Sequence, residues 1–165
     1  MTVAWGVTPL FAAPRIVSIN PCVDAVLVRL AEPAQILGIS HYSQDARATS
    51  IPLSVARHFR ATSGTAEEVV ALAPDMVMAG EHVAPSTIHM LQRLNIPLVK
   101  FGVPSSIAES EEQVRSIARI VGQPARGEHM VAAIEAAVEA ARPTRPSAIP
   151  ALIWQSGGLV PGSGT

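Results

Sequence analysis

The sequence is poor in several residue types, and each scarcity excludes a class of protein. Cysteine occurs once, at Cys22, so no disulfide can form within the chain, and no HxxxH or CxxC spacing predicts a metal site. Aromatic residues make up 4% of the chain. No apolar run approaches the ~20 residues of a membrane span. The formal net charge is −1, without the basic patch that nucleic-acid binding requires, so we expect no nucleic-acid partner.

What the chain does contain is apolar surface to bury. It has 165 residues, of which 48% are hydrophobic, and this is enough for one globular domain with its own core. Residues 1–14 are apolar and lack Arg and Lys, so they match the end of a secretory signal, with Ala12 and Ala13 at the boundary. We predict a periplasmic location on this basis, with a disordered terminus as the alternative interpretation of the same residues.

Short β-rich runs alternate with helical patterns along the chain, which predicts an α/β fold. The fold class is a parallel sheet with helices on both faces, followed by a long helix over residues 125–141 that Pro143 ends. The expected strands span residues 15–19, 36–39, 76–79, 98–101 and 151–155. We divide the chain into a lobe at 15–124, a connecting helix at 125–142 and the start of a second lobe at 143–165.

Residues 64–79 carry the densest local signal. Thr65 and Glu68 have the spacing of a capping box, Pro74 ends the helix, and residues 76–79 form an apolar run typical of a buried strand. These roles leave Glu67 without a local function, apart from the favourable placement of a carboxylate in the first turn of a helix.

Ligands bind at the carboxyl edge of an open parallel sheet, so the loops at this edge hold the candidate site. His41, Tyr42 and His82 are candidates because imidazole and phenol groups stack on and hydrogen-bond large conjugated ligands. Exposed loops also carry such residues without any function, and this remains the alternative. The other candidates at this edge are Asn20, Cys22, Glu81, Trp154 and Gln155, the last two at the end of the expected strand 151–155.

Five segments together resemble the helical-backbone class of periplasmic binding proteins, which serve ABC importers for siderophores, heme and cobalamin. They read RIVSINPCVDAVL from residue 15, ILGISHYS from 36, AEEVVALAPDMVMA from 66, LQRLNIPLV from 91 and ALIWQSGG from 151. The resemblance implies two lobes joined by a rigid helix, with the ligand in the cleft between them. It also implies that Glu67 pairs with arginines of the membrane permease and that Tyr42 contacts a corrin ring.

The sequence departs from the cobalamin-binding type, which has tryptophans where residues 61–63 and 80–82 here contain no aromatic residue. Heme, a ferric siderophore or another metal chelate therefore stays open as the ligand beside cobalamin. We predict a non-enzymatic binding protein that needs no cofactor, with a possible dimer through the exposed surface between lobes. The rival hypotheses are an enzyme on a flavodoxin-like scaffold that uses His41, Tyr42 and His82, and a module that binds no small ligand.

Overall fold

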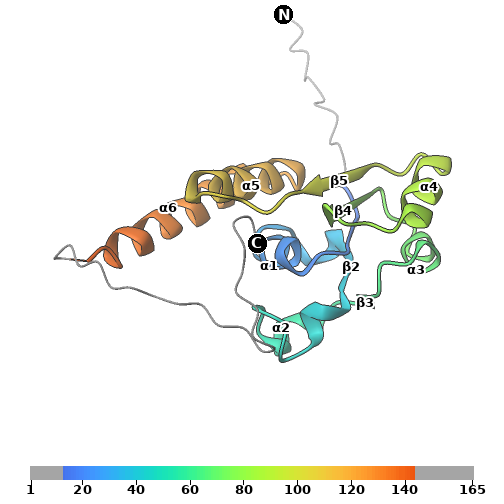
Figure 1. Ribbon diagram of the computed structural model, residues 1–165, viewed down its shortest axis with the longest axis horizontal. Helices are drawn as coiled ribbons and strands as arrows, with labels where there is room; N and C mark the ends of the chain where they lie inside the picture. The colour runs from blue at the N-terminus through green and yellow to red at the C-terminus, as the bar shows by residue number, and fades with distance from the viewer. Residues whose placement is uncertain (1–12, 144–165) are drawn as a thin grey trace, which may run out of the picture.

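Five parallel strands form one sheet in the computed structural model, which describes residues 13–143 (Figure 1). The strands lie in the order β3-β2-β1-β4-β5, so the chain first builds outward from β1 on one side and then returns to build on the other. Their bounds are β1 (Ile16–Ser18), β2 (Ile36–Ser40), β3 (Ala61–Thr62), β4 (Met76–Gly80) and β5 (Leu98–Phe101).

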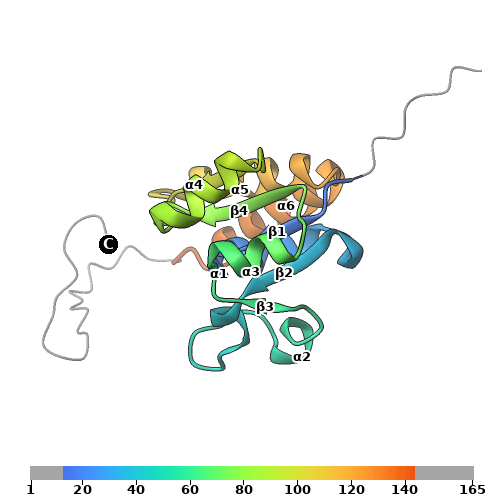
Figure 2. The ribbon, with the colours of Figure 1, turned by 90° about the vertical axis from the view of Figure 1, so that its right-hand side faces the viewer.

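Helices cover both faces of this sheet, which confirms the predicted fold class (Figures 1 and 2). One face carries α1 (Pro21–Leu30), α5 (Ile107–Ile120) and α6 (Pro124–Ala140), and the other carries α3 (Ala66–Ala71) and α4 (Pro85–Arg93). Short helical turns complete the lobe: η1 (Pro33–Gln35), η2 (His41–Gln44) and α2 (Leu53–Ala56). Among the described residues, no helix is both long and apolar enough to cross a membrane.

The two faces of the sheet bury separate hydrophobic clusters. Successive residues of a strand point to opposite faces, so Ile16 of β1 enters one cluster and Val17 enters the other. The larger cluster includes Leu27 of α1 and Ile117 of α5, and the smaller one includes Leu91 of α4. The near-continuous apolar character of the strands follows from this burial on both sides.

The helix cap forms where the sequence predicts it, but the glutamate side chain does not make the return hydrogen bond of a complete capping box. The hydroxyl oxygen of Thr65 accepts a hydrogen bond from the Glu68 N–H at 3.4 Å. The Glu68 carboxylate does not return to the N–H of Thr65 but accepts from the N–H of Ser63 at 2.6 Å. Glu109 likewise accepts from Ser105 while Ser106 caps α5. Each glutamate thus fastens its helix to the preceding loop.

The edge strand β3 was not predicted from the sequence. It has two residues, Ala61 and Thr62, which pair with Ile39 and Ser40 of β2 and are too few to give a periodic pattern. The expected strand at residues 151–155 lies outside the described residues.

Helix α6 packs on α5 through an unusually close contact. A Cβ atom at Gly127 would lie 2.4 Å from the Cβ of Ala118, so the two backbones meet where neither helix has a large side chain. This contact sets the rotation of α6. Along α6, Gly127 and Val131 are therefore buried, while Val138 is 37% exposed.

Replacing Gly127 with alanine is expected to destabilise the lobe, although alanine is the better helix former by about 1 kcal/mol. The added methyl group overpacks the contact with Ala118, and such overpacking costs about 1–3 kcal/mol. Urea denaturation should therefore give a lower free energy of unfolding for Gly127→Ala. Adding Ala118→Gly restores the space, so the double variant should lose less stability than the sum of the single losses. Strict additivity would contradict this account of the contact.

Candidate functional site

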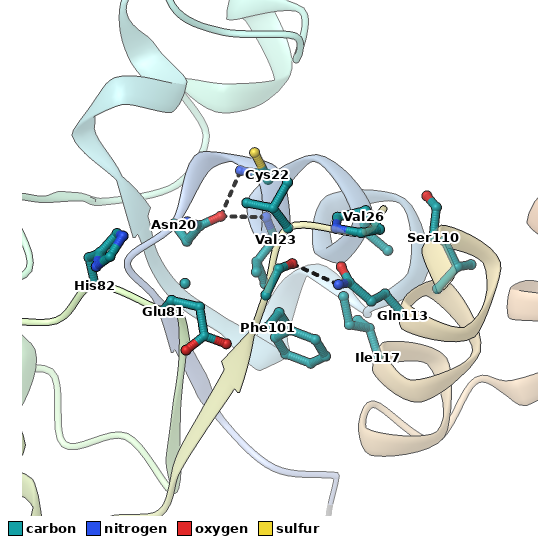
Figure 3. A pocket seen from close by; sticks show the side chains of 15 residues that line it. Asn20, Cys22, Val23, Val26, Glu81, His82, Phe101, Ser110, Gln113 and Ile117 are labelled. Carbon is teal, nitrogen blue, oxygen red and sulfur yellow. Dashed lines mark hydrogen bonds between the residues drawn. The ribbon is translucent and has the colours of Figure 1, made fainter. Parts of the chain in front are cut away.

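A pocket of about 410 Å³ opens at the carboxyl edge of the sheet, between the ends of β1, β4 and β5 and the helices α1 and α5 (Figure 3). Its walls are mainly apolar, with a few polar side chains at the mouth. The residues that line the pocket include Asn20, Val26, Glu81, Phe101, Gln113 and Ile117.

The strand order explains why a pocket forms at this place. β1 and β4 are neighbours in the sheet, but the chain leaves β1 into α1 on one face and leaves β4 into α4 on the other. The loops after these two strands therefore diverge and leave a crevice between them. In open parallel sheets such a switch point is the usual place for a ligand.

Asn20 and Gly80 meet on the two sides of this crevice. The Asn20 side-chain oxygen accepts hydrogen bonds from the N–H groups of Cys22 at 2.9 Å and Val23 at 3.1 Å, so it caps α1. Its amide nitrogen lies over Gly80, where a Cβ atom would be 2.4 Å away. Only glycine at the end of β4 leaves room for this cap, and the two residues together fix the floor of the pocket.

The loop after β5 is held over the other side of the pocket by α5. Gln113 donates a hydrogen bond from its side-chain nitrogen to the carbonyl oxygen of Gly102 at 2.7 Å (Figure 3). This bond positions Val103, whose side chain is 87% exposed beside the pocket mouth.

The structure brings four of the predicted ligand-binding residues together at this pocket: Asn20, Cys22, Glu81 and His82. His41 and Tyr42 lie apart from it in η2, after β2, where their rings are 4.0 Å apart. Tyr42 is 53% exposed, so it remains accessible to a ligand at the same edge of the sheet. Trp154 and Gln155 lie outside the described residues.

Hydrogen bonds connect the loop of His41 to the start of α3. A ring nitrogen of His41 lies 3.3 Å from the Thr62 carbonyl oxygen, and the Thr62 hydroxyl donates to the Glu68 carboxylate at 3.0 Å. The N–H and hydroxyl of Ser63, together with the Thr62 hydroxyl, hold the pKa of Glu68 below its usual value. Glu68 is thus engaged in the loop, whereas the neighbouring Glu67 has an exposed side chain.

Asp24 is a buried carboxylate that was not among the site residues predicted from the sequence. One of its oxygens accepts from the N–H of Ser40 at 2.9 Å and from the hydroxyl of Ser43 at 2.6 Å, while the other has no hydrogen-bond partner within the described part of the chain. Burial raises the pKa of Asp24 to about 7, although the hydroxyl groups of Ser18 and Ser43 and the N–H of Ser40 oppose the shift. Asp24 therefore ties α1 to the loop that carries His41 and Tyr42.

A local signal could have indicated Asp24, but none could have indicated the pocket wall from α5. Asp24 follows Val23 and precedes Leu27 by three positions, so a charged residue stands on the buried stripe of a helix. The apolar wall from α5, which includes Ile117, has no local signal, because its place beside α1 depends on the packing of distant helices. Within residues 13–143, no group of three or more His, Cys, Asp or Glu side chains could hold a metal ion.

The chain belongs to the periplasmic binding protein family, whose model matches residues 16–165. This is the family that the sequence segments predicted. It is a family of binding proteins and not of enzymes, as the sequence also predicts. Among curated protein sequences, none gives a significant match.

Solved structures of similar fold agree with this assignment. A periplasmic heme-binding protein from Pseudomonas aeruginosa has 18% identity and a TM-score of 0.65, over 77% of this chain and 45% of that one. The heme-binding protein RhuT from Roseiflexus has 24% identity and a TM-score of 0.65, over 82% and 53%. The vitamin B12-binding protein BtuF of Vibrio cholerae has 15% identity and a TM-score of 0.61, over 78% and 49%. The chain spans about half the length of these proteins, and the likeness establishes the fold of a lobe.

The contribution of Asp24 to the stability of the lobe is expected to fall as the pH rises from about 4 to about 7. The folded protein holds a proton on Asp24 up to a pKa of about 7, whereas the unfolded chain releases it near 3.8, so the folded state binds more protons in this window. Above pH 7 the Asp24 contribution levels off. In Asp24→Asn, which cannot ionise, urea denaturation from pH 4.5 to 8 should show a flatter profile than in the wild type.

A second variant separates this effect from those of other titrating groups. Ser43→Ala removes a hydrogen bond that favours the ionised carboxylate, so it should raise the pKa of Asp24 in the folded protein. The fall in stability should then extend to higher pH. Parallel profiles for the wild type and Asp24→Asn would show that Asp24 ionises in the folded protein as it does in the unfolded chain.

Proposed function

We propose that this protein is the ligand-capturing component of an ABC importer, which binds a metal chelate or corrinoid in the periplasm and delivers it to a membrane permease. The observation that carries the proposal is the pocket at the switch point of a lobe from the periplasmic binding protein family. Its volume and its mainly apolar wall suit a ligand of drug-like size or one edge of a larger ligand.

Heme, cobalamin and a ferric siderophore are the ligands we infer. Structures of similar fold include proteins named for binding heme and vitamin B12. The pocket supports such ligands because Val26, Phe101 and Ile117 offer apolar contacts to a flat macrocycle or an organic chelator. We further propose that Tyr42, exposed at the same edge, contacts a part of the ligand that extends beyond the pocket.

The same proposal includes a second lobe, which would form the other side of the ligand-binding cleft. Residues 15–124 form the first lobe, residues 125–142 the connecting helix and residues 143–165 the start of the second lobe. The structure supports a connecting role for α6 because its residues after Val131 are exposed, apart from the partly buried Ile134. The exposed Val103 and Ile107 would face the surface that closes the cleft, whether a second lobe or a second copy of the chain.

A thermal-shift titration with hemin, cyanocobalamin and a ferric siderophore tests ligand binding. A ligand at a hundred times its Kd adds about 2.7 kcal/mol to stability, which raises the Tm of a chain of this size by roughly 5–10 °C. We expect one of the three to do so. Val26→Trp, which fills the pocket with a side chain, should abolish the shift while the variant stays folded by circular dichroism. Absence of a shift with every ligand would count against the proposal.

Glu67 is proposed as the residue that docks the protein on its permease. It is an exposed carboxylate in the first turn of α3, and a carboxylate can pair in bidentate fashion with a permease arginine. Glu67→Ala and Glu67→Arg should leave ligand affinity unchanged and reduce uptake into permease-containing vesicles by roughly fivefold or more, the equivalent of about 1 kcal/mol.

The matched control is Glu135→Ala, which removes an exposed carboxylate from α6. It should transport as the wild type does. If vesicles take up ligand at the same rate with the Glu67 and the Glu135 variants, Glu67 does not dock the protein. Its role would then be to stabilise α3 through the favourable interaction with the helix dipole.

A further inference from the structure

The pocket has an uneven distribution of charge. Among the described residues that line it, Glu81 is the one carboxylate, and none is an arginine or a lysine. Its other polar groups are amide, hydroxyl, thiol and imidazole groups, from Asn20, Gln113, Ser110, Cys22 and His82. An anionic group entering the pocket would therefore meet a carboxylate and no arginine or lysine to pair with.

Cations nearby are occupied by other partners. The ammonium group of Lys100 donates to the backbone carbonyl oxygen of Glu81 at 3.4 Å, and Lys100 lines the hollows along β5 outside this pocket. On α5, Arg115 pairs with Glu128 at 3.1 Å and Arg119 pairs with Glu112 at 2.6 Å. These guanidinium groups would have to give up an ion pair to reach a ligand.

The start of α1 does not compensate for this lack of cations. A helix N-terminus attracts anions through its free N–H groups and its dipole. Here the N–H groups of Cys22 and Val23 already bond to the Asn20 side chain, so they are not available to a ligand. The dipole that remains corresponds to roughly half an elementary charge, against the full negative charge of Glu81.

We propose that Glu81 determines the charge specificity of the pocket, so that it admits the neutral or cationic apolar edge of a metal chelate and rejects anionic chelates. The inference rests on the proposed function, because it concerns the ligand of that same pocket. It favours a macrocycle whose acidic groups point away from the pocket, or a ferric hydroxamate. It disfavours a ferric tris-catecholate, which carries three negative charges.

Two pairs of probes that differ mainly in charge test this specificity. One pair is hemin dimethyl ester and hemin, and the other is a cationic ferric tris-hydroxamate and an anionic ferric tris-catecholate. In the wild type, the more anionic member of a pair that binds should have the higher Kd. In Glu81→Gln, which keeps the shape of the side chain, this ratio of Kd values should shrink by roughly three- to tenfold, as expected for a partly screened charge at close range.

Two further variants make the test specific. Glu135→Gln changes the net charge by the same amount on α6, away from the pocket, and should leave the ratio unchanged. Ser110→Lys places a cation in the pocket wall and should shift preference toward the anionic member of each pair, which tests whether the probes occupy this pocket. Raising the salt concentration should narrow the ratio in the wild type and have less effect in Glu81→Gln.

The outcomes separate the two proposals. If the wild type binds a probe pair but Glu81→Gln leaves the ratio of Kd values unchanged, or salt does not narrow that ratio in the wild type, the charge specificity is overturned while the binding function stands. If the wild type binds neither pair nor cyanocobalamin, the proposed function fails, and the inference about its ligand fails with it.

Discussion

The contact between Asn20 and Gly80 is the constraint on which the candidate site depends. Asn20 must cap α1 at the end of β1, and its amide fits only because β4 ends in a residue without a side chain. Gly80 in turn pairs with Phe101 of β5. Asn20, Gly80 and Phe101 therefore form one row across the edge of the sheet, and this row sets the start of α1 and the floor of the pocket. A side chain at position 80 would displace the cap and change both.

Helix α1 connects this row to the other loops of the edge. Its N-cap residue, Asn20, packs over Gly80 at the end of β4. Asp24 of the same helix accepts hydrogen bonds from Ser40 at the end of β2 and from Ser43 in the turn that carries Tyr42. A buried carboxylate is costly when it ionises, and an apolar residue in its place would pack without this cost. An apolar residue, however, could not bond the N–H of Ser40 and the hydroxyl of Ser43 at once. The position of the loop is therefore maintained at some expense of stability at neutral pH.

Local chemistry decides how much of this arrangement can be predicted from the sequence. The cap by Thr65 and the apolar run at 76–79 are signals within a few residues, and the structure confirms both of them. The pocket wall from α5 and the two-residue strand β3 depend on contacts between segments far apart in the chain, which no local pattern encodes. The residues at the ends of β1 and β4 were predicted because all parallel strands end at one edge. Which of them share a pocket depends on the strand order.

The segment from 64 to 79 shows how structure separates scaffold from function. Asp75 accepts a hydrogen bond from the N–H of Arg15 at 2.8 Å, which fastens the start of β4 to the start of β1, and Glu68 bonds the loop before α3. These bonds account for the conspicuous residues of the segment without any ligand or partner. Glu67 is different, because its side chain is exposed and lies on a helix that does not line the pocket. Under the proposed function, capture and docking use separate side chains of one edge, so a change in either should leave the other unaltered.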